Sequence, residues 1–195
     1  MTIALIDNYD SFTYNLVHYL ESFNINVTVF RNNEYELKEL LPFDALVLSP
    51  GPGLPKDAGL LLKTINTYYK TKPIFGVCLG LQAIAENFGS TLKNLETVYH
   101  GVSSEITVLK NDDVLYLNLP NKIYVGRYHS WVVQKNTLPS FISITAIDSN
   151  EEVMSFSHNF YPICAVQYHP ESVLTPLGKT IIKNWINSIK LPSKN

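Results

Sequence analysis

The sequence is poor in charge, in basic clusters and in long apolar runs, and each shortage excludes a class of protein. Charged residues are only 16% of the 195 residues, and 15 Lys and Arg nearly balance 17 Asp and Glu. Without a basic run, the electrostatic footprint of a nucleic-acid-binding protein is missing, so we expect no nucleic-acid partner. No stretch approaches the roughly 18 apolar residues that a membrane helix needs, so we expect no membrane contact. Disorder is excluded as well, because hydrophobic residues make up 46% of the chain.

Cysteine is scarce, and the opening residues are not typical of a secreted chain. Residues 1–7 contain no basic segment and reach Asp7 after a few apolar residues, unlike a signal peptide. Cys78 and Cys164 are the two cysteines, and without a secretory signal we expect no disulfide between them. We therefore expect a cytoplasmic protein with free thiols.

Strand-like and helix-like segments alternate through the first ninety residues. The predicted strands, short apolar or alternating runs, cover residues 3–6, 27–29, 45–48 and 74–77. The predicted helices, with apolar residues at helical spacing, cover residues 12–23, 37–41, 57–68 and 79–88. Asp10 or Ser11 is placed to cap the first helix, Asp57 to open the third and Gly89 to end the fourth. Such alternation predicts a parallel sheet covered by helices on both faces.

The second half of the sequence is predicted to be rich in strands separated by turns. These strands cover residues 104–109, 123–133, 141–147, 153–156 and 163–167, and a helix follows over residues 177–189. We expect a single α/β domain over residues 1–190, with a mainly parallel central sheet, flanking helices and an antiparallel section in the second half. Residues 191–195 are expected to form a loose C-terminal tail.

A cysteine flanked by glycines follows the fourth predicted strand. Gly76 and Gly80 stand two residues to either side of Cys78, in the pattern of a nucleophile elbow with Cys in place of Ser. Side chains at the two glycines would collide with the sharp strand-to-helix turn. The N-terminus of the following helix favours the thiolate form of a cysteine. Cys78 is therefore a candidate nucleophile, and the alternative is a buried structural cysteine between two packing glycines.

A histidine and a glutamate follow the last predicted strand, and they could complete such a site. In an extended segment residues i and i+2 share a face, so His169 and Glu171 can point together. Pro170 favours the extended geometry of the histidine before it. A carboxylate in this position can fix the imidazole tautomer and stabilise its charged form. On its own His-Pro-Glu is more often an ordinary turn, and its pairing with the elbow favours the catalytic interpretation.

The loop after the third predicted strand is rich in glycine and proline. Gly51, Pro52 and Gly53 would let backbone N–H groups approach a substrate in a stiff loop. The N–H groups of Gly53 and of Leu79, the residue after the cysteine, suit an oxyanion hole. An ordinary rigid strand-exit loop explains this segment equally well.

Taken together, these motifs resemble those of the class I, or triad, glutamine amidotransferases in order and spacing. They are Pro50-Gly51-Pro52-Gly53, Gly76-Val77-Cys78-Leu79-Gly80-Leu81-Gln82 and Tyr168-His169-Pro170-Glu171. The opening segment, residues 7–15, resembles the glutaminase components of anthranilate synthase and of aminodeoxychorismate synthase. The resemblance spans nearly the whole chain.

The resemblance implies a chemistry and a set of site residues. Cys78 would attack the side-chain amide of glutamine, with His169 as base and then as acid, and water would cleave the γ-glutamyl thioester. The residues that would hold the glutamine substrate are Gly51, Pro52, Gly53 and Gln82, with the backbone of Ser130 and Trp131. Sequence alone leaves the segment around Ser130 open to being an ordinary strand end.

The resemblance also implies a partner, a chorismate-binding synthase large subunit that would use the ammonia. The pathway would be tryptophan synthesis through anthranilate, with folate synthesis through aminodeoxychorismate, or service to both, as the alternative. We expect no metal and no cofactor in this chain, and Mg²⁺ only in the partner subunit. A nucleotide synthetase as ammonia acceptor, a partner-free hydrolase of γ-glutamyl compounds, and a catalytically silent regulatory or binding module remain competing hypotheses.

Three residues depart from the family pattern, and none belongs to the proposed triad. Leu81 stands where histidine is usual, Val102 where lysine is frequent, and Trp131 where leucine is commoner. We expect their effects in packing, in partner contacts or at the edge of the substrate pocket.

Overall fold

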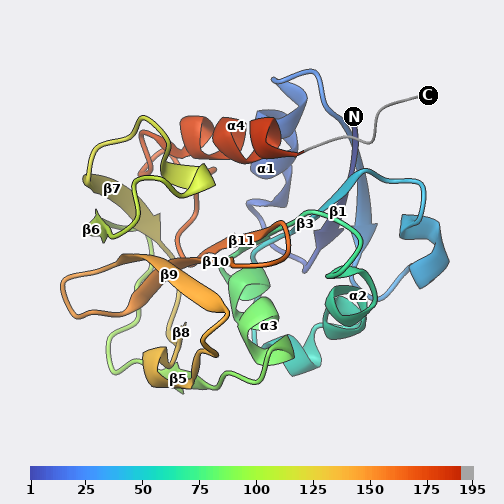
Figure 1. Ribbon diagram of the computed structural model, residues 1–195. Coiled ribbons are helices and arrows are strands. Elements are labelled where there is room, and N and C mark those ends of the chain that lie inside the picture. Colours follow the sequence, from blue (N-terminus) through green and yellow to red (C-terminus); the bar gives the residue numbers. More distant parts are fainter. Residues whose placement is uncertain (190–195) are drawn as a thin grey trace.

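The computed structural model describes residues 1–189, and within them a nine-stranded sheet carries helices on both faces (Figure 1). The strand order is β2-β1-β3-β4-β11-β10-β9-β6-β7. Its strands in chain order are β1 (Thr2–Asp7), β2 (Asn26–Arg31), β3 (Ala45–Leu48), β4 (Ile74–Val77), β6 (Val102–Val108), β7 (Lys122–Arg127), β9 (Ile142–Ile147), β10 (Val153–His158) and β11 (Ile163–Val166). A separate two-stranded sheet pairs β5 (Leu92–Asn94) with β8 (Trp131–Val133).

The sheet is mixed, as the sequence predicts. Strands β2, β1, β3, β4 and β11 pair in parallel. From β11 onward, β10, β9, β6 and β7 pair antiparallel. Both halves of the chain therefore contribute to one sheet, and the predicted α/β class with an antiparallel second section is confirmed.

Helices cover the two faces in pairs. The helices are α1 (Thr13–Glu21), α2 (Leu61–Tyr68), α3 (Leu79–Asn87) and α4 (Gly178–Ser188), with 3₁₀ turns at Leu37–Leu40, Pro55–Asp57, Val114–Tyr116 and Lys135–Thr137. Helices α1 and α4 lie on one face, and α2 and α3 lie on the other (Figure 1). Because side chains alternate along a strand, Val47 joins the core under α1 and α4, while Leu46 joins the core under α2 and α3.

The prediction of one strand over residues 123–133 is wrong. Strand β7 ends at Arg127, the chain turns, and β8 begins at Trp131 in the other sheet. In the turn, the carbonyl groups of His129 and Ser130 accept hydrogen bonds from the N–H groups of Tyr99 and Leu95, so they leave the strand ladder. The break carries residues 128–131 away from the sheet and, as shown below, to the functional site.

The starts of α1 and α2 differ from the predicted ones, whereas α3 begins at Leu79 and ends before Gly89 as predicted. Helix α1 begins at Thr13 without a side-chain cap. The Asp10 carboxylate instead accepts a hydrogen bond from the N–H of Phe12, the residue before the helix. Asp57 ends a 3₁₀ turn rather than opening α2. Gly89 follows α3 with φ +89°, a conformation that glycine adopts without strain. Local turns compete with helix starts, which explains why the starts were harder to predict.

None of the helices within residues 1–189 combines the length and apolar character that crossing a bilayer would demand. The predicted tail at residues 191–195 lies outside the described residues.

Candidate active site

The three sequence motifs meet at one edge of the sheet. Strand β4 lies between β3 and β11, and all three run in parallel. Gly51–Gly53 follow the carboxyl end of β3, Cys78 follows that of β4, and His169 follows that of β11. Open α/β sheets bind ligands at this edge, because neighbouring loops there enclose a crevice.

Cys78 occupies a strained turn between β4 and α3. Its backbone has φ 53° and ψ −103°, a region that side-chain-bearing residues rarely adopt and that is found mainly at functional sites. Its N–H donates to the Val166 carbonyl at 2.8 Å, which ties the turn to β11. A Cβ at Gly80 would lie 2.5 Å from the Leu48 carbonyl oxygen, and one at Gly76 would lie 2.8 Å from the Gly80 backbone. The predicted collisions at both glycines are therefore present.

His169 and Glu171 lie together behind the cysteine, as the extended geometry predicts. The His169 Nδ1 and Glu171 Oε1 atoms are 2.7 Å apart, and both residues are buried. The other ring nitrogen, Nε2, has no hydrogen-bond partner among the described residues. It is the nitrogen left for the Cys78 thiol, because Nδ1 is held by the glutamate.

The electrostatics make His169 a stronger base than an isolated histidine. Burial alone lowers the pKa of His169, but the interactions with Cys78 and Glu171 outweigh burial and raise that pKa well above its ordinary value of 6.5. Burial raises the pKa of Glu171, and its interaction with His169 opposes that rise. The arrangement can therefore hold a proton between a thiol and a carboxylate.

Two aromatic rings hold the imidazole in place. The rings of Phe12 and Tyr128 lie 5.3 and 4.8 Å from the His169 ring, and 4.9 Å from each other. The backbone N–H of His169 donates to the Gly126 carbonyl at 3.0 Å. These contacts restrict rotation of the histidine, and no sequence motif indicated them.

A cavity of about 200 Å³ opens beside the cysteine. Its lining contains Cys78 and every residue predicted to hold glutamine: Gly51, Pro52, Gly53, Gln82, Ser130 and Trp131. Tyr128 and His129 complete the lining. The volume lies below the usual range of pockets for drug-sized ligands and suits a small substrate.

The structure places the two predicted oxyanion-hole residues next to the cysteine. Leu79 is the first residue of α3, where a backbone N–H has no partner within the helix. Gly53 lines the cavity with φ +74°. Their role as donors to an oxyanion stays a prediction.

Gln167 is a site residue that the sequence analysis missed. Its Nε2 group donates to the Cys78 Sγ atom at 3.5 Å, and its Oε1 atom accepts from Gln82 Nε2 at 3.2 Å. The same Gln82 nitrogen donates to the Trp131 carbonyl at 3.0 Å, which leaves the Gln82 side-chain oxygen for a ligand. The signal in the sequence was a glutamine directly after the apolar run of residues 163–166, and the structure shows that this side chain is fully buried.

A second opening of about 410 Å³ reaches the cysteine from another side. It contains Cys78 and His169 and is lined by Tyr9, Phe12 and His100 among others. Cys78 therefore borders two cavities, and a molecule bound in the smaller one does not fill the larger.

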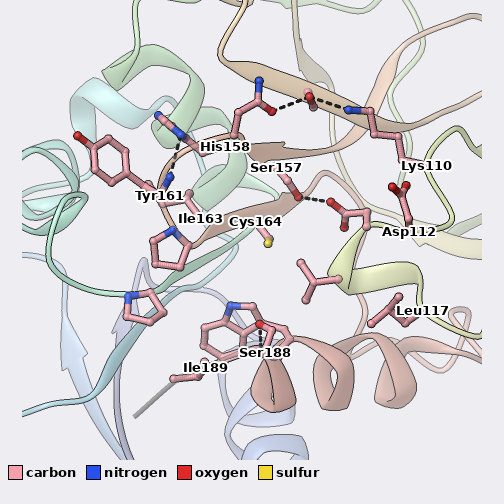
Figure 2. A pocket seen from close by; sticks show the side chains of 17 residues that line it. Lys110, Asp112, Leu117, Ser157, His158, Tyr161, Ile163, Cys164, Ser188 and Ile189 are labelled. Atoms are coloured by element: carbon pink, nitrogen blue, oxygen red, sulfur yellow. Dashed lines mark hydrogen bonds between the residues drawn. The ribbon is translucent and has the colours of Figure 1, made fainter. Parts of the chain in front are cut away.

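Another cavity, of about 480 Å³, lies elsewhere and contains no predicted site residue (Figure 2). Pro73 and Pro162 line it, at the ends of β4 and β11 opposite the functional edge. Cys164 borders it, and burial raises the pKa of this thiol to about 12. Cys164 is thus a buried apolar residue, as predicted, and is unsuited to act as a nucleophile.

The three departures from the family pattern occupy different environments. Leu81 is fully buried and packs in the core under α2 and α3, so it affects packing. Val102 is an exposed residue at the start of β6. Trp131 lines the small cavity. Within the described residues, no group of three or more His, Cys, Asp or Glu is arranged to hold a metal ion.

Comparisons with known proteins show which family the chain is similar to. The family model for glutamine amidotransferase class-I matches residues 4–189. The aminodeoxychorismate/anthranilate synthase component 2 of Bacillus subtilis is 42% identical over 191 residues, covering 96% of this chain and 97% of that protein. Anthranilate synthase beta subunit 1 of Arabidopsis thaliana is 42% identical over 194 residues, covering 96% of this chain and 70% of that protein. A crystal structure from Thermoplasma acidophilum, of a protein provisionally named as a GMP synthase component, superposes with a TM-score of 0.86 at 27% identity, covering 96% of this chain and 92% of that one.

Proposed function

Because the chain belongs to the class-I glutamine amidotransferase family, we propose that it is the glutaminase subunit of a chorismate-using synthase, most directly anthranilate synthase. The observation that carries the proposal is the position of Cys78. It stands on a strained elbow, lines one opening together with a histidine that a buried glutamate holds, and borders a second cavity of substrate size.

The first half of the proposed reaction forms a thioester. His169 takes the thiol proton, and the Cys78 sulfur attacks the side-chain carbonyl carbon of glutamine. The N–H groups of Gly53 and Leu79 stabilise the negative oxygen of the tetrahedral intermediate. As the intermediate collapses, the C–N bond breaks and His169 gives its proton to the leaving ammonia. The products of this half are a γ-glutamyl thioester on Cys78 and one ammonia molecule.

The second half regenerates the thiol. Water, deprotonated by His169, attacks the thioester carbonyl, the C–S bond breaks, and the proton passes to the sulfur. Glutamate is released. Glu171 stabilises the imidazolium at each stage through the 2.7 Å contact with Nδ1. Thiol, imidazole and backbone N–H groups supply the chemistry, so the proposal requires no metal or cofactor in this chain and assigns Mg²⁺ to the partner.

The partner is proposed to be a chorismate-binding synthase large subunit. The names of the relatives, which describe synthase components, support it. An exposed aromatic residue at the larger opening also supports a protein contact, because Tyr9 lines this opening and is 46% exposed. A partner seated there would receive ammonia next to its point of release.

Service to aminodeoxychorismate synthase is the second candidate function. The name of the Bacillus subtilis relative, which covers both synthases, favours a subunit that serves both pathways. A nucleotide synthetase as acceptor has weaker support, because the likeness to the Thermoplasma acidophilum protein is 27% identity against 42% for the synthase components.

Anthranilate fluorescence tests the proposal. The chain or its Cys78→Ala variant is mixed with an anthranilate synthase large subunit, chorismate and Mg²⁺, and the nitrogen source is either glutamine or ammonia. We expect glutamine-dependent anthranilate with the native chain, none with the variant, and equal ammonia-dependent synthesis with both. Ammonia-dependent synthesis alone with the native chain would point to the aminodeoxychorismate partner or to a silent module, and the same assay with that partner separates these two.

A further inference from the structure

The wall of the small cavity opposite Gly51–Gly53 is a turn with little regular structure. Residues 128–130 connect β7 to β8, and they line the cavity together with Trp131, the first residue of β8. Two backbone hydrogen bonds to the segment 95–99 hold the outer side of the turn. The side facing the cysteine is held differently, by side chains.

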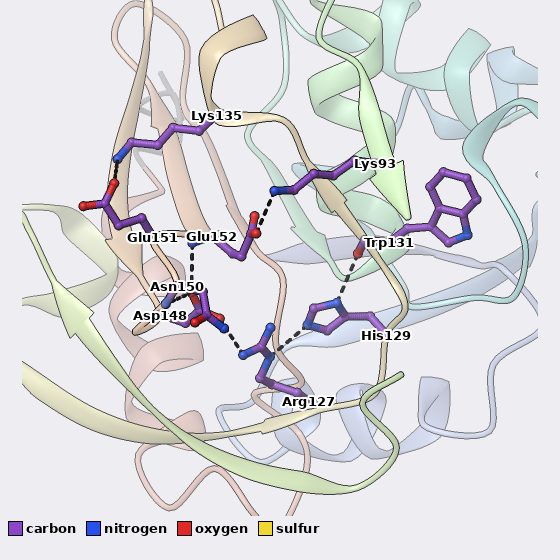
Figure 3. Close-up of polar contacts among 9 residues, drawn as sticks. All are labelled: Lys93, Arg127, His129, Trp131, Lys135, Asp148, Asn150, Glu151 and Glu152. Atoms are coloured by element: carbon purple, nitrogen blue, oxygen red, sulfur yellow. Dashed lines mark hydrogen bonds and ion pairs between the residues drawn. The ribbon is translucent and has the colours of Figure 1, made fainter. Parts of the chain in front are cut away.

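A buried ionic network lies directly behind this turn (Figure 3). The Arg127 guanidinium donates from Nη1 to Asp148 Oδ2 at 2.7 Å, and both side chains are 2% exposed. The Arg127 carbon Cζ lies 3.6 Å from the centre of the Tyr99 ring. Asp148 is fixed in turn, because its Oδ1 atom accepts from the N–H groups of Asn150 and Glu152 at 2.9 and 2.8 Å. The arginine is therefore held by an ion pair and by an aromatic ring, although its Nη2 group has no hydrogen-bond partner among the described residues.

Arg127 determines the tautomer of His129, two residues further along the chain. Arg127 Nε lies 3.1 Å from His129 Nε2, and a guanidinium nitrogen can only donate. The Nε2 atom must then be an acceptor, so the proton of neutral His129 lies on Nδ1. Burial, with the nearby Arg127 charge, lowers the pKa of His129 to about 3, so the ring stays neutral at physiological pH. Nδ1 donates to the Trp131 carbonyl at 3.1 Å.

The Trp131 carbonyl thus receives two donors from different parts of the fold. His129 Nδ1 approaches from the turn itself, and Gln82 Nε2 approaches from α3 at 3.0 Å. Gln82 continues through Gln167 to the Cys78 sulfur. The carbonyl is the point where the ionic network behind the turn joins the hydrogen bonds that reach the nucleophile.

We propose that Arg127 and His129 are positioning residues for glutamine: Arg127 fixes the tautomer of His129, and His129 fixes the Trp131 carbonyl and with it the cavity wall. This inference rests on the proposed function, because it assigns the wall to the glutamine site. Neither side chain contacts the reacting atoms, so their effect falls on substrate affinity rather than on the chemical step.

Two neutral amide variants of His129 separate this role from a structural one. In His129→Asn the side-chain nitrogen can take the place of Nδ1 and donate to Trp131, but Arg127 Nε loses its acceptor. In His129→Gln the side-chain oxygen can take the place of Nε2 and accept from Arg127, but the donor to Trp131 is lost. His129→Asn therefore preserves the position of the Trp131 carbonyl and lowers the stability of the fold. His129→Gln preserves the stability of the fold and releases the Trp131 carbonyl.

The test is glutamate release by the chain in complex with the synthase subunit, together with the thermal midpoint of each variant. We expect the KM for glutamine to rise about tenfold in His129→Gln with kcat changed less than about twofold, the size expected for one lost hydrogen bond. We expect the KM of His129→Asn to stay within about twofold of the native value although its thermal midpoint is the lower of the two.

A purely structural role would give the opposite order, with the larger KM in the less stable variant, and would overturn the inference. Equal KM values in all three proteins, or a His129→Gln chain that does not fold, would overturn it too. A native complex that releases no glutamate overturns the proposed function and this inference with it, so the two failures are distinguishable.

Discussion

Replacing Gly80 by alanine sets helix propensity against the geometry of the elbow. Gly80 is the second residue of α3, where alanine would ordinarily stabilise a helix by about 1 kcal/mol. The new Cβ would lie 2.5 Å from the Leu48 carbonyl oxygen and 2.8 Å from the Leu48 Cβ. Leu48 belongs to β3, which is paired on both sides by β1 and β4, so the strand cannot retreat. The helix must move instead.

The size of the effect follows from these two opposing contributions. Overpacking of a tight site costs about 1–3 kcal/mol, and the propensity gain of alanine offsets about 1 kcal/mol of it. For a chain of this length, a net loss of about 1 kcal/mol lowers the thermal midpoint by about 2–4 °C. A displacement of α3 also moves the N–H of Leu79 and the Cys78 turn, and a shift of about 1 Å in a catalytic group can cost about 100-fold in rate.

Gly89→Ala is the matched control. Gly89 has φ +89° and no atom within 4 Å of the position that a Cβ would take, so alanine there costs backbone strain of about 1–2 kcal/mol without any collision. It also lies at the far end of α3 from the cysteine. We expect both variants to lose similar thermal stability and only Gly80→Ala to lose glutamine-dependent activity, by about 100-fold. A Gly80→Ala complex as active as the Gly89→Ala complex, or as stable as the native chain, would refute the close packing of the elbow.

Three further predictions concern the groups around the thiol. The raised pKa of His169 contributes stability that is complete below about pH 6.5 and is lost as pH rises through the raised value, so the thermal midpoint of the native chain should fall between pH 6 and 9. Glu171→Gln removes the partner charge and should flatten or reverse this fall. Identical pH profiles of the native chain and the variant would contradict the prediction. Iodoacetamide at neutral pH should label Cys78 and leave Cys164 unlabelled in the folded chain, because burial raises the pKa of the Cys164 thiol to about 12. Peptide mass spectrometry can check this, and labelling of both cysteines at equal rates would contradict it. Gln167→Leu should slow the labelling of Cys78 by about tenfold, because the amide hydrogen bond to the sulfur is lost, while Gln134→Leu, a change at a partly exposed glutamine away from the thiol, should not change it.

The elements with strong local signals were predictable from the sequence. Short apolar runs such as residues 45–48 and 74–77 match β3 and β4 to the residue, and Gly89 marks the end of α3. The elbow was predictable as well, because its two glycines flank the cysteine at the spacing that a sharp strand-to-helix turn requires. In each case the determinant lies within a few residues of the element that it controls.

The parts that sequence could not predict depend on contacts between distant segments. Residues 123–133 are β-prone throughout, and nothing local shows that the segment 95–99 captures the carbonyl groups of its middle. Strand β5 has three residues, too few for a pattern, and exists because β8 pairs with it. The contact of Gln167 with Cys78 joins the ends of two strands 89 residues apart, so it becomes visible only when the order of the strands is known.

The central claim is that Cys78 carries the γ-glutamyl group, and trapping that thioester tests it most directly. The native complex is mixed with isotopically labelled glutamine and chorismate, quenched in acid during turnover and digested, and the two cysteine-bearing peptides are analysed by mass spectrometry. We expect one labelled glutamyl group on the Cys78 peptide and none on the Cys164 peptide. Glutamine turnover with no label on Cys78, or with label on Cys164, would contradict the claim.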